Sequence, residues 1–78
     1  MSGRTDAEQA WLEAVGLRLR LGRVKRRLSQ RRAAKLAGLS SVTLGSMERA
    51  EHVAGLQSYV QAARAVDLPL AELLDGAP

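Results

Sequence analysis

Residues 30–49 read Q-R-R-A-A-K-L-A-G-L-S-S-V-T-L-G-S-M-E-R, and this segment organises the rest of the chain. It predicts a helix-turn-helix, whose first short helix has small residues on its inner face: Ala33, Ala34 and Ala37. Gly38 ends that helix, because glycine adopts the left-handed conformation at a helix C-terminus without a Cβ clash. Ser40 has the residue type of an N-cap for the second helix, whose Leu44 and Met47 share one face and return to the core.

These residues resemble the helix-turn-helix of the phage repressor and Cro class, also called the Xre-like family. The family pattern has glutamine, alanine, glycine and two larger apolar residues at fixed positions, here Gln30, Ala34, Gly38, Leu44 and Met47. The flanking segments G-L-R-L-R-L-G-R, M-E-R-A and L-P-L-A-E-L-L extend the resemblance over residues 15–74. It implies an all-α fold, a compact five-helix lambda-repressor-like domain with a central helix-turn-helix and a lengthened first helix.

Composition limits the alternatives. The 78 residues predict one domain, and the absence of cysteine excludes disulfides and thiolate zinc sites. No apolar run approaches the length of a membrane span. The net charge is +4, and no acidic residue lies between Glu13 and Glu48. The basic residues of that interval are Arg18, Arg20, Arg23, Lys25, Arg26, Arg27, Arg31, Arg32 and Lys35. Such a localised positive charge favours a polyanionic partner.

The expected domain covers residues 6–76, after a flexible N-terminus of residues 1–5. Asp6 is the predicted N-cap of the first helix, with Gln9 completing a capping box, and this helix runs to about Arg27. The further helices are expected at residues 30–37, 41–49, 55–66 and 69–74. The fourth should bury five residues: Leu56, Tyr59, Val60, Ala63 and Val66.

The first helix has two apolar stripes. One consists of Leu12, Val15 and Leu19, and the other of Leu17, Leu21, Val24 and Leu28. The second stripe indicates an additional contact, either with the closing helix or with a second subunit. The family usually has leucine in place of Gly22, so either a neighbouring helix comes very close or Leu21 replaces it in the core. Ala50 replaces the usual glycine, which predicts mild backbone strain or a different helix end.

The resemblance implies which side chains meet DNA. The third helix of the family enters the major groove, and its first residues touch base edges. The implied base-reading residues are Ser41, Val42, Thr43, Gly45 and Ser46. The expected phosphate contacts are Gln30, Arg31, Arg32, Arg49 and His52. Arg23 and Glu48 match a second family signature, an ion pair between the first helix and the end of the third.

The sequence therefore predicts a sequence-specific double-stranded DNA-binding transcriptional regulator that acts by operator occupancy. A homodimer, RNA polymerase as a further partner and a cytoplasmic, nucleoid-associated location are expected. No catalytic residues, metal site, cofactor, small-molecule ligand or membrane contact is expected. An alternative is a protein-interaction module on the same scaffold, such as an antitoxin or a polymerase-binding adaptor. A basic amphipathic helix on an anionic membrane is a third reading, and it requires the first helix to expose its apolar stripe.

Overall fold

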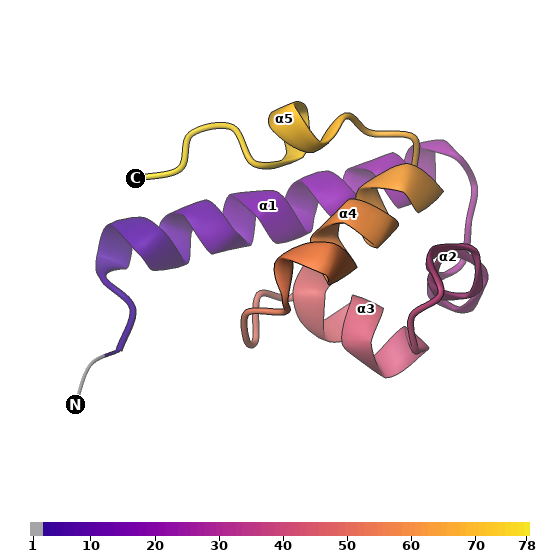
Figure 1. Ribbon diagram of the computed structural model, residues 1–78, viewed down its shortest axis with the longest axis horizontal. Coiled ribbons are helices and arrows are strands. Elements are labelled where there is room, and N and C mark those ends of the chain that lie inside the picture. The colour runs from indigo at the N-terminus through magenta and orange to yellow at the C-terminus, as the bar shows by residue number, and fades with distance from the viewer. Residues whose placement is uncertain (1–2) are drawn as a thin grey trace.

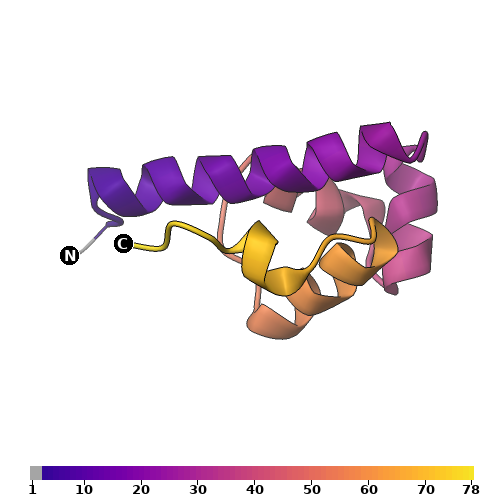
Figure 2. The same ribbon diagram turned by 90° about the horizontal axis from the view of Figure 1, so that it is seen from above.

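The computed structural model describes residues 3–78 and contains five α-helices in that range (Figure 1). They are α1 (Asp6–Lys25), α2 (Gln30–Ala37), α3 (Ser41–Glu48), α4 (Leu56–Ala65) and α5 (Leu70–Leu73). The long α1 runs along the whole molecule, with α5 on one side, α3 on the other and α4 crossing it (Figure 1). Seen from above, α2 stands at the C-terminal end of α1 and completes the globule (Figure 2). The predicted all-α, five-helix architecture is confirmed.

The first helix begins one residue away from its predicted cap. Thr5, not Asp6, is the N-cap: its hydroxyl accepts from Glu8 N at 3.1 Å, and Glu8 Oε1 accepts from Thr5 N at 2.7 Å. Gln9 instead donates to Glu13, so the predicted Asp6–Gln9 capping box is wrong. The capping box forms between Thr5 and Glu8 because the side chain of each residue accepts a hydrogen bond from the backbone N–H of the other. Of the expected flexible residues 1–5, the first two lie outside the described part.

The turn between α2 and α3 has the predicted capping chemistry. Ser29 accepts from Arg32 N at 3.0 Å, and Ser40 accepts from Thr43 N at 3.0 Å. Gly38 has φ +73° and ends α2 in the left-handed conformation. These three local signals orient α3 relative to α2, and the boundary residues agree with the sequence prediction to within one residue.

The core lies between α1 and the other four helices. Its largest fully buried side chains are Val15, Leu19, Leu44, Met47 and Leu73. One expectation for α4 is wrong, because Leu56 is 65% exposed at the first position of the helix, beyond the edge of the core. Val60 is half-buried, and Ala62 is buried beside Tyr59 and Ala63.

Two departures from the family pattern now have structural reasons. Gly22 faces Val66, whose Cγ2 would lie 3.1 Å from an added Cβ, so a neighbouring segment does come very close there. Leu21 does not replace it in the core, since it is 58% exposed. Ala50 is buried and has φ +54°, a left-handed conformation that is costly for a residue with a Cβ. The helix α3 therefore ends with the strain that the sequence predicted as one alternative.

Within residues 3–78, no helix is both long enough and apolar enough to cross a bilayer.

Candidate nucleic-acid interface

The first turn of α3 projects from the surface. Ser41 is exposed, and Val42 is 78% exposed, the largest exposure among the large apolar side chains of the described residues. Thr43 is half-buried, and its Oγ1 accepts a hydrogen bond from Ser40 Oγ at 2.9 Å. Leu44 and Met47 point inward, as their spacing predicted. The exposed edge of α3 is therefore short and consists mainly of Ser41 and Val42.

Ser46 is not part of this edge. It is only 3% exposed, and its Oγ lies 2.9 Å from His52 Nδ1 in the loop that follows α3. The prediction that Ser46 is available to a base is wrong, because the loop folds back and covers it. His52 itself is exposed, and its predicted phosphate contact stays a prediction.

Gly45 lies under two polar side chains. A Cβ added to Gly45 would be 3.0 Å from Arg49 Nη1 and 3.3 Å from Gln30 Oε1. The glycine therefore makes room for a guanidinium and an amide to rest on the surface of α3, and it does not present an open surface itself. Arg49 and Gln30 thus lie beside the middle of α3, and their predicted contacts with phosphate stay a prediction.

Arg49 is held in place by an acidic residue that the sequence analysis did not single out. Its Nε and Nη2 donate to Glu51 Oε2 and Oε1 at 2.9 and 3.2 Å. The hydrogen bond and charge of Glu51 raise the pKa of Arg49, and the Arg49 guanidinium holds the pKa of Glu51 below its ordinary value. Both side chains are more than half exposed, so the pair is open to solvent and to ligands. Residue spacing alone gives no signal for this pair, because it depends on how the loop after α3 turns.

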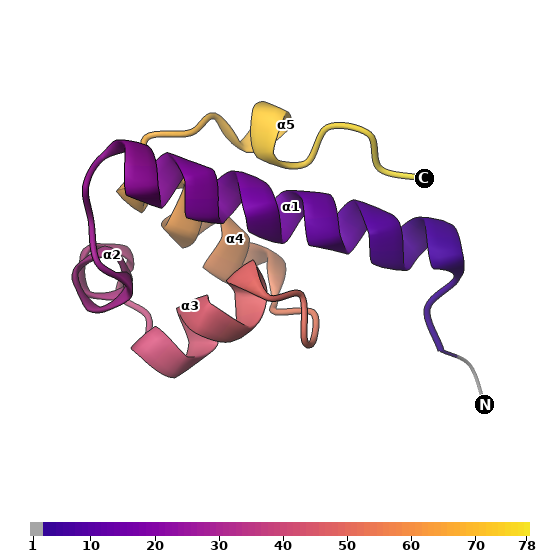
Figure 3. The same ribbon diagram turned by 180° about the vertical axis from the view of Figure 1, so that it is seen from behind.

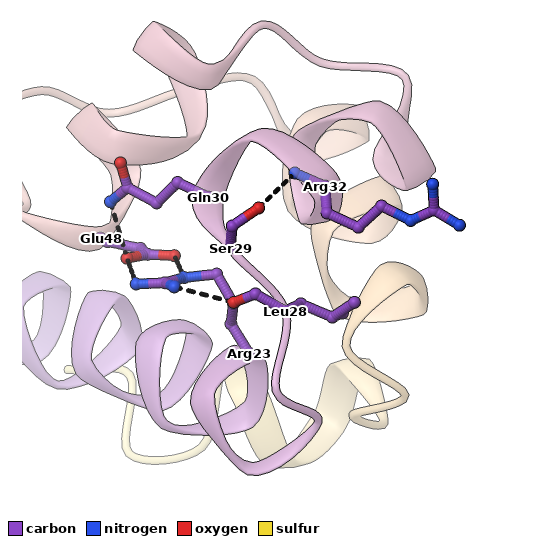
Figure 4. A network of polar contacts seen from close by, with 6 residues as sticks. All are labelled: Arg23, Leu28, Ser29, Gln30, Arg32 and Glu48. Atoms are coloured by element: carbon purple, nitrogen blue, oxygen red, sulfur yellow. Dashed lines mark hydrogen bonds and ion pairs between the residues drawn. The ribbon is translucent and has the colours of Figure 1, made fainter.

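The predicted ion pair between Arg23 and Glu48 is present. Arg23 Nε lies 2.7 Å from Glu48 Oε2, and Nη2 lies 3.0 Å from Oε1. Gln30 Nε2 donates to the same carboxylate at 3.1 Å, while Arg23 Nη1 donates to the Leu28 carbonyl at 3.0 Å (Figure 4). This network joins α1, the segment before α2, α2 and the end of α3. Glu48 therefore orients the side-chain amide of Gln30, whose Oε1 lies beside Gly45.

Some cations of the basic interval make hydrogen bonds within the protein, and others are exposed to solvent. Arg18 donates to the carbonyls of Leu73 and Asp75 at 3.0 and 2.7 Å, and Arg26 donates to the Val66 carbonyl at 2.9 Å. With Arg23, these arginines stabilise contacts between helices. These three members of the basic interval are therefore engaged by carbonyl or carboxylate groups of the protein itself.

Of the six other cations in this interval, three lie on or directly after α1 and three lie on α2. Arg31, Arg32 and Lys35 are exposed, and α2 contains no acidic residue. They line an open groove of about 590 Å³ that also reaches Ser29 and Ser41. Arg32 points away from the ion-pair network in Figure 4. The three cations of α2 therefore lie next to the exposed turn of α3, on a surface suited to phosphate.

The arrangement of α2 and α3 defines the class of helix-turn-helix proteins. Residues 14–75 match the helix-turn-helix domain family, and the chain belongs to that family. It is accordingly a DNA-binding protein of the transcription-regulation type, consistent with the Xre-like resemblance.

Solved structures agree with this assignment. The restriction-modification controller protein C.AhdI from Aeromonas hydrophila is 36% identical over 82% of this chain and 97% of that chain, with a TM-score of 0.77. The hypothetical transcription factor NHTF from Neisseria is 25% identical over 95% and 84% of the two chains, with a TM-score of 0.75. The clp gene regulator ClgR from C. glutamicum, at 23% identity over 82% and 83%, shares the fold with a TM-score of 0.74. No match was found among curated protein sequences.

Proposed function

We propose that this protein is a sequence-specific double-stranded DNA-binding transcriptional regulator that acts without catalysis, by occupying its operator. The observation that carries this proposal is the position of the exposed first turn of α3 beside the free cations of α2. An α-helix fits the major groove of B-DNA, where each base pair presents a distinct pattern of donors, acceptors and methyl groups. Occupancy then acts by blocking RNA polymerase or by touching it from a neighbouring site.

The side chains divide by role. Val42 suits contact with a thymine methyl group, and Ser41 can donate to or accept from a base edge. Arg31 and Arg32 suit phosphate contacts, which position the protein without reading sequence. Since the exposed part of α3 carries only short side chains, DNA shape and phosphate contacts contribute a large share of the selectivity.

A single α3 reads too few base pairs to select a site, so the proposal includes a homodimer on two half-sites. Twofold symmetry then places two reading helices about 34 Å apart on a near-palindromic operator. A cytoplasmic, nucleoid-associated location follows from binding to genomic DNA.

Selection from a random pool of duplexes tests the proposal directly. We expect enrichment of a near-palindromic sequence, and a fall in affinity of about 10³-fold or more between 50 and 200 mM salt if about six phosphates are neutralised. The same selection with Val42→Ala should enrich a different sequence, while the protein keeps its fold. If no duplex is enriched above background, the proposal is wrong, and the scaffold serves as a protein-interaction module instead.

A further inference from the structure

The side chain of Arg49 extends along the face of α3 on which Ser41 is exposed. Arg49 is the C-cap residue and keeps a right-handed helical backbone, with its N–H donating to the Gly45 carbonyl at 3.0 Å. Ser41, Gly45 and Arg49 are spaced by four residues, so they form one line along the helix. Figure 3 shows α3 at the edge of the molecule, on the far side of α1 from α5. Both ends of this line are exposed to solvent.

Gly45 leaves the space in which the guanidinium of Arg49 lies. A Cβ added to Gly45 would be 3.0 Å from Arg49 Nη1 and 3.5 Å from Nη2. Helical side chains lean toward the N-terminus of their helix, and one turn of helix is about 5.4 Å long. The guanidinium therefore lies about one turn nearer to Ser41 and Val42 than the backbone of Arg49 does. A side chain at residue 45 would occupy the same space.

Glu51 binds only one edge of this guanidinium. Arg49 Nε and Nη2 donate to the two carboxylate oxygens of Glu51 at 2.9 and 3.2 Å. A guanidinium has five N–H donors in a rigid, planar fork, so the edge formed by Nη1 and Nη2 keeps two parallel N–H groups for another acceptor. In the part of the chain that the structure describes, Nη1 makes no hydrogen bond. The Arg49 side chain is 55% exposed, so a ligand can reach it.

We propose that Arg49 reads a guanine in the major groove through its Nη1–Nη2 edge, with Glu51 as the residue that positions it. Guanine presents two acceptors in that groove, O6 and N7, and a bidentate arginine is the most common way to read them. Planar recognition needs a guanidinium held in one orientation, which the two hydrogen bonds to Glu51 and the space over Gly45 supply. The inference rests on the proposed function, in which α3 enters the groove. It assigns Arg49 to a base in place of the phosphate contact expected from the resemblance.

The acidic partner distinguishes Arg49 from the arginines of α2. A phosphate contact requires a positive charge within reach, and a neighbouring carboxylate weakens the attraction of that charge for a polyanion. A base contact benefits from the same carboxylate, because it fixes the plane of the guanidinium and occupies the edge that the base does not use. Within residues 3–78, Arg31 and Arg32 form no ion pair with a carboxylate, although both are exposed. Those two arginines therefore suit phosphate, whereas the pairing of Arg49 suits a base.

Replacing each kind of arginine by methionine tests the assignment. Arg49→Met and its matched control Arg31→Met both remove one positive charge and keep an unbranched side chain. Selection from a random pool of duplexes is carried out with the wild-type chain and with both variants. We expect Arg49→Met to reduce the preference for guanine at one position of each half-site by about fivefold or more, while the preferences at the other positions are retained. Arg31→Met should weaken binding to all sequences alike. A uniform loss for Arg49→Met as well would assign Arg49 to phosphate and overturn the proposal.

A modified base provides a measurement on the wild-type chain. A guanine analogue that carries C–H in place of the N7 acceptor is placed at the selected position of the duplex. The wild-type chain should bind this duplex about fivefold or more weakly than the natural one, because one hydrogen bond from a charged donor is lost. Arg49→Met should bind the two duplexes equally. Equal binding by the wild-type chain would overturn the proposal.

Gly45→Ala tests the place of the guanidinium without removing a charge. The added Cβ would lie 3.0 Å from Arg49 Nη1 and should displace it, so we expect the same guanine preference to fall. An unchanged preference would contradict the position of the guanidinium over residue 45. An operator that is selected without any guanine dependent on Arg49 would overturn this inference alone. A wild-type chain that enriches no duplex would overturn the proposed function as well.

Discussion

Arg23 and Glu48 form a bidentate ion pair between α1 and the end of α3, with N–O distances of 2.7 and 3.0 Å. The side chains are 13% and 3% exposed, so both charges are largely removed from water. The pair satisfies its remaining groups through Gln30 and the Leu28 carbonyl. Because it ties α3 to α1, we interpret it as the contact that fixes the angle at which α3 leaves the protein.

Replacing one partner of this pair should be far more harmful than replacing both. Arg23→Ala leaves the Glu48 carboxylate buried without its cation, at a cost of about 3–5 kcal/mol in the free energy of unfolding. For a domain of this size that loss approaches the whole stability. The double variant Arg23→Met with Glu48→Met removes both charges and should recover most of it. Urea unfolding measures both, and a double variant less stable than Arg23→Ala would contradict the assignment.

Gly16 and Gly22 should respond differently to the same substitution. Alanine gains about 1 kcal/mol over glycine inside a helix. At Gly16 the new Cβ would clash with the Glu48 carbonyl oxygen and lie 2.7 Å from that of Met47, and these backbone atoms move only if α3 shifts. At Gly22 the nearest atom is a Val66 side-chain methyl at 3.1 Å, which can yield. We expect Gly16→Ala to lose about 1–2 kcal/mol, since overpacking costs about 1–3 kcal/mol, and Gly22→Ala to be neutral or more stable. Equal effects in thermal unfolding would show that α1 and α3 are not in close contact.

The sequence predicted those parts of the fold that local chemistry determines. Ser29, Gly38 and Ser40 each act within a few residues of their own position, so residue type and spacing sufficed to place α2, the turn and α3. The Arg23–Glu48 pair was anticipated from its resemblance to a family signature. It could not have been derived from charge alone, because the partners are 25 residues apart.

The errors concern contacts made by segments without a regular pattern. Ser46 has the spacing of a surface residue on α3, but the following loop brings His52 over it. Leu56 has the spacing of a core residue, but it precedes the part of α4 that reaches the core. Arg18 belongs to a basic run, yet the C-terminal segment offers it two carbonyls. For Ser46 and Arg18 the deciding neighbour is set by the path of an irregular segment, and for Leu56 the exposure is set by where α4 begins; periodicity encodes neither.

Ala50 offers a stabilising substitution. Its φ of +54° costs a residue with a Cβ about 1–2 kcal/mol relative to glycine, while removal of its buried methyl group forfeits about 0.8 kcal/mol. We therefore expect Ala50→Gly to raise the free energy of unfolding by about 0.2–1.2 kcal/mol. Ala10→Gly, at an exposed position inside α1, is the control and should lose about 1 kcal/mol. A loss in both variants would mean that the left-handed conformation at Ala50 is not the source of strain.

Ser46 and Val42 should separate stability from base selection. Ser46→Ala removes the hydrogen bond to His52 and should lower the free energy of unfolding by about 0.5–1.5 kcal/mol without changing the selected DNA sequence. Val42→Ala changes an exposed side chain and should alter stability by less than about 0.5 kcal/mol. It should, however, change the preferred base beneath it. Selection from a random pool together with thermal unfolding measures both properties. If Ser46→Ala changes the selected sequence, Ser46 does contribute to base recognition and this prediction is wrong.

Glu51 should limit DNA affinity while it keeps Arg49 in position over Gly45. Glu51→Gln removes a negative charge from the proposed DNA-facing surface and releases the guanidinium. We expect affinity for all duplexes to rise, with the slope of log affinity against log salt steeper by about 1, because one more phosphate is neutralised. The preference for the selected sequence should fall, since Arg49 is no longer held in one orientation. Glu72→Gln on α5 makes the same charge change away from α3 and should leave both properties unaltered.

The protonation of Glu51 determines the pH range of this effect. Arg49 holds the pKa of Glu51 below its ordinary value of 4.5, so the carboxylate stays ionised and paired throughout the neutral range. The contribution of the pair is therefore present above that ordinary value and is lost only as the pH falls through the lowered pKa. A titration of the Glu51 carboxyl by NMR should show the lowered pKa in the wild-type chain and an ordinary value in Arg49→Ala. An ordinary value in both chains would mean that Arg49 is free in solution and is not held over Gly45 by Glu51.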